Sequence, residues 1–220
     1  MTTAASLLTR RAFLISTVAL GAASSLSGCA AISAIGDVAT PLDAYELRVD
    51  SALAPRAARP LARALIIEVP EVAGALDTDR ILARPNPLQA QYLPGARWID
   101  PPATLVQGLI VRNLEDSGGL RFVGRRPVGA GGDFALIGTL SNFEAELAED
   151  GSVTTHIRYS ARLVREDDAA IIAARVFEAR VPSENDAVLS TVKAFNDAAE
   201  TVIPEVSRWV LSRLGARLTS

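Results

Sequence analysis

The 220-residue chain has one cysteine, Cys29, and one histidine, His156. A single cysteine has no partner for an internal disulfide, and one thiol with one histidine is too small a set for a zinc site. The histidine falls on the polar side of a predicted strand, which leaves no base for a Ser–His–Asp triad. Metal ligation would have to rest on carboxylates alone. We therefore expect no catalytic residues, no metal and no cofactor, and we do not expect an enzyme.

The chain also lacks a long apolar run and a surplus of positive charge. The run from Ala12 to Leu20 is too short for a stable transmembrane helix, which needs roughly 20 apolar residues, and no later run is long and apolar enough. Residues 1–28 hold two of the 22 basic residues and none of the 25 acidic ones, so the remainder has a net charge of −5. Because nucleic-acid binding needs cations to neutralise phosphates, nucleic acid is not an expected partner.

The first 28 residues have the three parts of a secretory signal. Arg10 and Arg11 form the basic end, Ala12–Leu20 is the apolar middle, and small residues precede Cys29. The Arg-Arg-Ala-Phe-Leu run also resembles a twin-arginine export signal. We therefore interpret residues 1–28 as a signal peptide that is removed from the mature protein.

The context of Cys29 decides how the lone cysteine is interpreted. Leu26-Ser27-Gly28-Cys29 resembles the lipobox of bacterial lipoproteins, in which the cysteine is acylated and becomes the first residue. The alternatives are a buried apolar cysteine, or an ordinary cleavage site beside an incidental one. The lipobox implies a domain anchored by acyl chains on the periplasmic side of the cell envelope. Ala30, which stands where an aspartate would favour the inner membrane, points to the outer membrane by analogy with enterobacterial sorting.

Residues 29–42 are small and mixed, which is typical of a flexible tether, and residues 43–220 form the predicted domain. Alternating or β-branched runs and turn signals predict strands. The expected strands lie at 45–49, 64–69, 81–84, 90–93, 120–124, 134–143, 153–164 and 171–181. The last three form a predicted meander. We expect an α+β fold with an antiparallel or mixed sheet and two main helices packed on one face.

Start and stop signals define the two helices. Asp100 is a candidate cap for the first helix, which should end at Gly118–Gly119. The second helix is predicted to begin at Ser183, from a capping-box spacing, and to carry a continuous apolar stripe as far as Leu214. Because the stripe continues beyond Pro204, we expect this proline to kink the helix and not to end it.

The middle strand of the meander has one apolar and one polar face. His156 lies on the polar face, and we expect it to be a solvated strand residue. The same expectation applies to a nearby acidic group at a strand end and turn, which consists of Glu144, Glu146, Glu149 and Asp150.

Several segments together resemble a known family. They are Thr78–Ile81, Ala96–Pro102, Phe134–Glu144, Ala194–Ala198 and Trp209. In this order and spacing, and with the lipobox, they are similar to the ABC-type transport auxiliary lipoprotein components over nearly all of the mature chain. Gln91–Gly95 departs from the family pattern by an extra proline and glycine, so a partner contact is expected to differ there.

The resemblance implies a periplasmic lipoprotein that accompanies an ATPase, a permease and an MCE-domain protein in moving lipids or other apolar compounds. Two alternatives stay open, which are a carrier that binds the lipid itself and a structural envelope lipoprotein. A homo-oligomer also stays open. Trp98 has two interpretations, a core residue or a contact with a partner protein. Its neighbours Arg97 and Asp100 are candidate surface anchors or local caps.

Overall fold

Strand β7 (Phe134–Leu147) is the centre of the sheet in the computed structural model, which describes residues 41–126 and 132–219. One edge of β7 pairs along its length with the antiparallel strand β8 (Val153–Arg165), and β8 pairs in turn with β9 (Ala170–Pro182). The expected three-strand meander is therefore confirmed. Each of the three strands contains its predicted range and extends beyond it by one to four residues.

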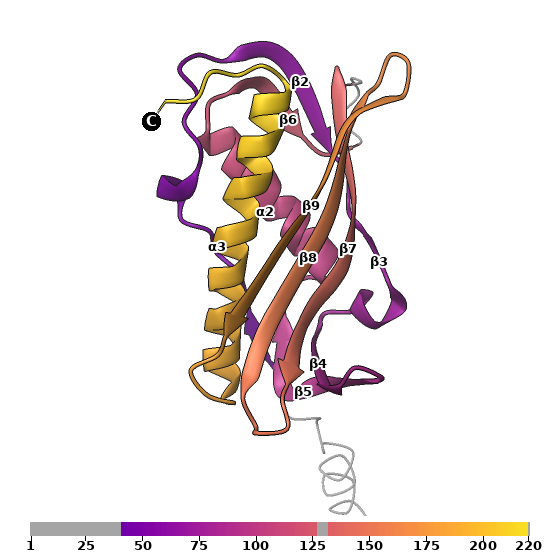
Figure 1. Ribbon diagram of the computed structural model, residues 1–220, viewed down its shortest axis with the longest axis vertical. Coiled ribbons are helices and arrows are strands. Elements are labelled where there is room, and N and C mark those ends of the chain that lie inside the picture. Colours follow the sequence, from indigo (N-terminus) through magenta and orange to yellow (C-terminus); the bar gives the residue numbers. More distant parts are fainter. Residues whose placement is uncertain (1–40, 127–131, 220) are drawn as a thin grey trace, which may run out of the picture. The chain divides into compact units, whose positions relative to one another are not determined.

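The other edge of β7 pairs in parallel with three strands in succession, which are β2 (Leu61–Ile67), β3 (Glu71–Val72) and β4 (Arg80–Asn86). Three further strands extend the sheet: β6 (Leu120–Gly124) beside β2, β5 (Gln89–Trp98) beside β4, and β1 (Asp43–Tyr45) beside β5. In Figure 1, β2 and β6 lie toward one end of β7, and β4 and β5 toward the other.

Helices α2 (Pro102–Asp116) and α3 (Val188–Arg213) lie on the same side of this sheet (Figure 1). Helix α3 packs on β8, β9 and α2, while α2 also contacts β2 and β6. Two short 3-10 helices, η1 (Ser51–Leu53) and η2 (Gly74–Leu76), complete the described elements. The fold is α+β with a mixed sheet, as the sequence predicted.

The apolar stripe of α3 is buried by packing against the sheet. Its members Val192, Phe195, Ala199, Val202, Val206 and Trp209 are all buried. Phe195 lies 5.2 Å from Trp98 of β5 and 5.1 Å from Phe143 of β7, measured between ring centroids. Burying one large apolar side chain contributes about 1.5–3 kcal/mol, so this three-ring contact is a substantial part of the attachment of α3.

The first helix begins where the sequence predicted but lacks the predicted cap, and the predicted start of the second helix is wrong. Pro101 is the N-cap residue of α2, and no side chain accepts a hydrogen bond from the free backbone N–H groups of the first turn. Asp100 therefore does not have the expected capping role. Helix α3 begins at Val188 and not at Ser183, because the backbone N–H of Ser183 still donates to the carbonyl of Val153 in the sheet, at 2.8 Å. The predicted passage through Pro204 is confirmed, since α3 continues to Arg213.

The first predicted strand is displaced. Strand β1 ends at Tyr45, and the following residues leave the sheet. Leu47 is nevertheless fully buried, and the backbone N–H of Arg48 donates to Asn196 Oδ1 of α3 at 2.8 Å. The alternation of residues 45–49 therefore reflects a segment that covers the helix, and not a strand with one wet face.

Gly138 of β7 gives a direct test of the packing. A Cβ atom at this position would collide with the buried ring of Tyr159 on the neighbouring strand. We expect Gly138→Ala to lower the free energy of unfolding by about 1–3 kcal/mol, because overpacking a dense core forces side chains out of their rotamers. Urea unfolding followed by circular dichroism measures this. Gly74→Ala is the matched control, since no atom lies within 4 Å of its added Cβ, and equal stability losses in both variants would contradict the assignment.

Candidate functional site

His156 is the centre of a row of charged side chains on the face of the sheet opposite the hydrophobic core. Its Nδ1 atom lies 3.0 Å from Glu146 Oε1 on β7, and its Nε2 atom lies 2.9 Å from Glu178 Oε1 on β9. The second oxygen of Glu146 binds Arg180, and the second oxygen of Glu178 binds Arg158. The result is a continuous chain in the order Arg180, Glu146, His156, Glu178, Arg158, which links three strands.

The expectation that His156 is solvated is wrong. The residue is only 3% exposed, even though the strand face it occupies is polar. The register explains this, because His156 lies directly between Glu144 of β7 and Arg180 of β9. The long side chains of these and the adjacent strand residues cover the ring. Alternation alone predicted the face correctly, but it could not predict that neighbouring side chains would remove water from it.

Glu144 is likewise buried, at 3% exposure, and was expected to be solvated. Its Oε2 atom forms an ion pair with Arg84 Nε of β4 at 2.8 Å, and its Oε1 atom accepts a hydrogen bond from Asn142 Nδ2 at 2.7 Å. A buried carboxylate needs such compensation, because its transfer out of water is costly. Glu144 and Arg84 therefore connect β7 to the β4–β5 hairpin beside the His156 row.

The charge of Glu178 is stabilised by its neighbours. Partial burial raises the pKa of this carboxyl, but hydrogen bonds from Arg158 and His156, and the charges of both residues, outweigh it. The pKa of Glu178 therefore lies below its ordinary value, and the side chain is an acceptor in this row.

A groove of about 620 Å³ lies next to the row, between the β4–β5 hairpin and the ends of β7 and β8. Arg84, Glu144 and Glu146 contribute charged groups to its lining, and Pro87 and Leu147 contribute apolar ones. Its volume is in the range of small-molecule sites, which are however mostly apolar. Because each lining carboxylate is already bound by an arginine, the groove offers no free charge of either sign among these residues.

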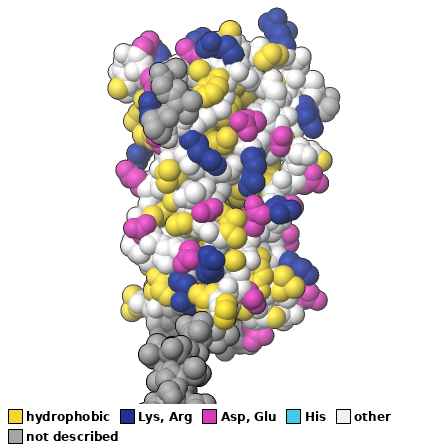
Figure 2. Space-filling model, turned by 180° about the vertical axis from the view of Figure 1, so that it is seen from behind, with side chains coloured by type: hydrophobic (Ala, Val, Ile, Leu, Met, Phe, Trp, Pro, Cys, Tyr) yellow, Lys and Arg dark blue, Asp and Glu magenta, His cyan; other side chains and the backbone are white. Residues whose placement is uncertain are grey.

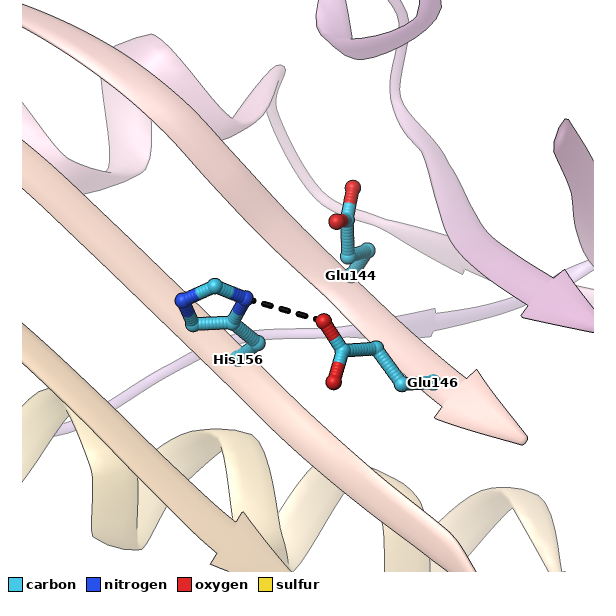
Figure 3. A group of neighbouring side chains, drawn as sticks. All are labelled: Glu144, Glu146 and His156. Atoms are coloured by element: carbon cyan, nitrogen blue, oxygen red, sulfur yellow. Dashed lines mark hydrogen bonds and ion pairs between the residues drawn. The ribbon is translucent and has the colours of Figure 1, made fainter. Parts of the chain in front are cut away.

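Glu144, Glu146 and His156 are close enough to be considered as metal ligands, since one candidate atom from each lies within 4.8 Å of the others. Figure 3 shows that only Glu146 faces the imidazole, while the Glu144 carboxylate is turned away. Both carboxylates are neutralised by arginines, and both ring nitrogens have carboxylate partners. A divalent cation would have to displace these contacts, so the arrangement favours an ion-pair network over a metal site.

The partner-contact residues predicted from the sequence lie elsewhere, at the end of β5. Trp98 is fully buried against Phe143 and Phe195, so its interpretation as a core residue is confirmed and its side chain does not reach the surface. Arg97 is 38% exposed and contacts Asp79 Oδ2 at 3.3 Å, and Asp100 is exposed. Arg97 and Asp100 thus both reach solvent near the end of β5.

The other predicted site residues, Cys29, Arg10 and Arg11, lie outside the described residues. On the side of the molecule shown in Figure 2, basic and acidic side chains are interspersed and are not gathered by sign. The sequence analysis did not predict the charged row around His156. One period-two pattern of charged or basic side chains runs through three consecutive strands and could have predicted the row. Its members are Glu144 and Glu146, His156 and Arg158, and Glu178 and Arg180.

The Arg84–Glu144 pair should contribute strongly to stability. We expect Arg84→Met to lower the free energy of unfolding by about 3–5 kcal/mol, because it leaves the buried Glu144 carboxylate without its cation. Arg175→Met is the control, since its ion pair with Glu205 is exposed on both sides and should be worth less than about 1 kcal/mol. Denaturant unfolding at neutral pH gives both values. Similar, small losses in the two variants would show that the buried pair is not needed.

The lowered pKa of Glu178 predicts an acid-dependent loss of stability. A carboxyl whose pKa is lower in the folded than in the unfolded chain stabilises the fold above its unfolded value of about 4.3. This contribution is lost as the pH falls through the lower, folded value. The free energy of unfolding of the wild type should therefore fall in this window, and Glu178→Gln should show a shallower fall. Parallel curves for the two proteins would contradict the assignment.

Comparisons with known proteins agree with this fold. Residues 45–207 match the family described as ABC-type transport auxiliary lipoprotein component. The crystal structure of protein XCC0632 from Xanthomonas campestris is similar, with 28% identity and a TM-score of 0.70, over 78% of this chain and 95% of that one. A crystal structure of an uncharacterized protein has 18% identity and a TM-score of 0.60, over 77% and 99% of the two chains. A comparison with curated proteins found no match.

Neither α2 nor α3, the helices of the described part of the chain, has the length and apolar character required to cross a membrane. The matched family is described as a lipoprotein component that is auxiliary to ABC-type transport. The match begins at Tyr45, the last residue of β1, and ends within α3, so it includes strands β2 to β9 in full. This chain therefore belongs to the ABC-type transport auxiliary lipoprotein component family.

Proposed function

We propose that this protein is a non-catalytic accessory subunit of an MCE/ABC-type system that transports lipids or other apolar compounds. The observation that carries the proposal is the family match over residues 45–207, which associates the chain with ABC-type transport. The proposed partners are the ATPase, the permease and the MCE-domain protein of one system. The protein acts by docking to them and supplies no chemistry of its own.

The proposed anchor is a set of acyl chains on Cys29, after export through Arg10 and Arg11 and removal of residues 1–28. Each buried methylene contributes about 0.8 kcal/mol, and more than one chain is needed for stable anchoring. The tether of residues 29–42 spans at most roughly 50 Å when fully extended. This length holds the domain of residues 43–220 close to the periplasmic surface of its membrane, for which we propose the outer membrane.

The proposed docking surface lies where the tether joins the domain. Strand β1 begins at Asp43, immediately after the tether, and pairs with β5 at Ala96–Trp98. Arg97 is half-buried at this end of β5, and Ile99 (42% exposure) and Asp100 are exposed. The buried Trp98 fixes the backbone between these residues. A partner that engages this surface would contact the domain close to the point where the tether joins it.

The feature that suggested a lipid carrier is not available to bind lipid. That alternative relied on the long apolar stripe of α3, and the members of this stripe from Val192 to Trp209 are buried against the sheet. The groove beside Glu144 is lined by paired charges, which do not suit an acyl chain. Accessory docking therefore has better support than lipid carriage.

The anchor is tested by Cys29→Ser in the full chain. We expect the variant to move from the membrane fraction to the soluble periplasmic fraction, because the hydroxyl cannot take the place of the acylated sulfur. Fractionation of the envelope followed by immunoblotting measures this. Ser33→Ala in the tether is the matched control and should remain with the membrane. If Cys29→Ser still sediments with membranes, the anchor is not at this residue.

The docking surface is tested by co-purification from detergent-solubilised envelopes. Wild-type protein should recover an MCE-domain protein or a permease, and Arg97→Ala with Asp100→Ala should reduce the recovery about tenfold, which corresponds to about 1.4 kcal/mol. Arg175→Ala, an exposed arginine on β9, is the control for a general loss of charge. Recovery of neither partner by the wild-type protein would overturn the proposed function. Normal recovery by the double variant would overturn only the surface.

A further inference from the structure

The two contacts of His156 impose a condition on its protonation. A neutral imidazole has one N–H donor, and its other nitrogen is an acceptor. Here both nitrogens face carboxylate oxygens, at 3.0 Å for Glu146 and 2.9 Å for Glu178. An ionised carboxylate can only accept a hydrogen bond. Both contacts are therefore hydrogen bonds only when both ring nitrogens carry a proton, so that the imidazole is positively charged.

We propose that His156 is a proton-dependent clamp. In its charged form it joins β7 to β9 across β8, through Glu146 and Glu178. When the ring loses one proton, the nitrogen that becomes an acceptor faces a carboxylate lone pair, and that glutamate is released. Glu146 and Glu178 are 33% and 36% exposed, so either side chain can turn toward water.

The charged groups around the ring both favour and oppose the clamp. Glu146 on β7 and Glu178 on β9 contact the ring directly. The other charged neighbours are Arg158 on β8, Arg180 on β9, and Glu144 of β7, whose carboxylate is turned toward Arg84 of β4. Burial and the arginines disfavour a charged imidazole, while Glu146 and Glu178 favour it. Arg158 and Arg180 bind the far oxygens of these same carboxylates, so each carboxylate lies between the ring and a guanidinium. The direct contacts at about 3 Å are therefore attractive.

The clamp has a consequence for the groove, because Glu146 belongs to both. Its carboxylate lines the groove together with Glu144, and it is also the β7 partner of His156. Release of Glu146 would leave this side chain held by Arg180 alone and free to move within the groove. The proton on His156 thus controls the cross-link between β7 and β9, and it also controls the shape of the groove wall when Glu146 is the residue released.

The experiment uses the fact that His156 is the only histidine in the chain. Its ring ¹⁵N signals and the glutamate carboxyl ¹³C signals can be followed by NMR from about pH 5 to about pH 9, around the ordinary imidazole value of about 6.5. We expect both ring nitrogens to give N–H signals at the acidic end. On raising the pH, the ring and the Glu146 or Glu178 carboxyl signal should change in one shared step. This readout needs no substitution.

Variants locate the clamp. Glu146→Gln and Glu178→Gln should each make the ring lose its proton at a lower pH than in the wild type, because each removes a negative partner. Glu205→Gln, whose side chain pairs with Arg175 and not with the ring, should leave the midpoint unchanged. The proposal is overturned if the ring is neutral throughout, if it titrates without the carboxyl signals, or if all three variants shift it equally. None of these outcomes bears on the proposed transport function.

Discussion

The pairing of β7 on both edges is the constraint on which the rest of the structure depends. One edge takes β8, which is next to it in sequence, and the other takes β2, β3 and β4 from the first half of the domain. A strand paired on both sides has its backbone groups satisfied in the interior of the sheet. It also fixes where Phe143 meets Trp98 and Phe195, so the aromatic contact that attaches α3 follows from the register of β7.

Much of this architecture was predictable, because it is encoded locally. Period-two alternation predicted the meander, and the stripe of α3 predicted a helix that packs on a sheet and passes through Pro204. The parallel pairing of β2, β3 and β4 with one long strand was not predictable in this way, since it joins segments far apart in the sequence. Element type thus followed from the pattern, while the order of strands required the structure.

The failures have a common physical cause, which is that tertiary contacts overrode a local signal. Ser183 has the spacing of a helix cap but is held in the sheet by Val153. The alternation after Tyr45 resembles a strand but is a segment bound to Asn196 of α3. His156 lies on a polar face, yet charged neighbours on β7 and β9 bury it. In each case the deciding group is more than 10 residues away or on another strand, outside any local window.

The two faces of the β7–β8–β9 sheet therefore do different work. The inner face is apolar and is covered by α3, so its side chains are buried within the protein. The outer face is held by ion pairs across strands, with a weakly basic side chain at the centre of the row. Hydrophobic packing does not change with a single proton, whereas a row centred on an imidazole does. In the proposed docking role, this outer face is therefore the part of the described sheet where a change of pH would alter the contacts between strands.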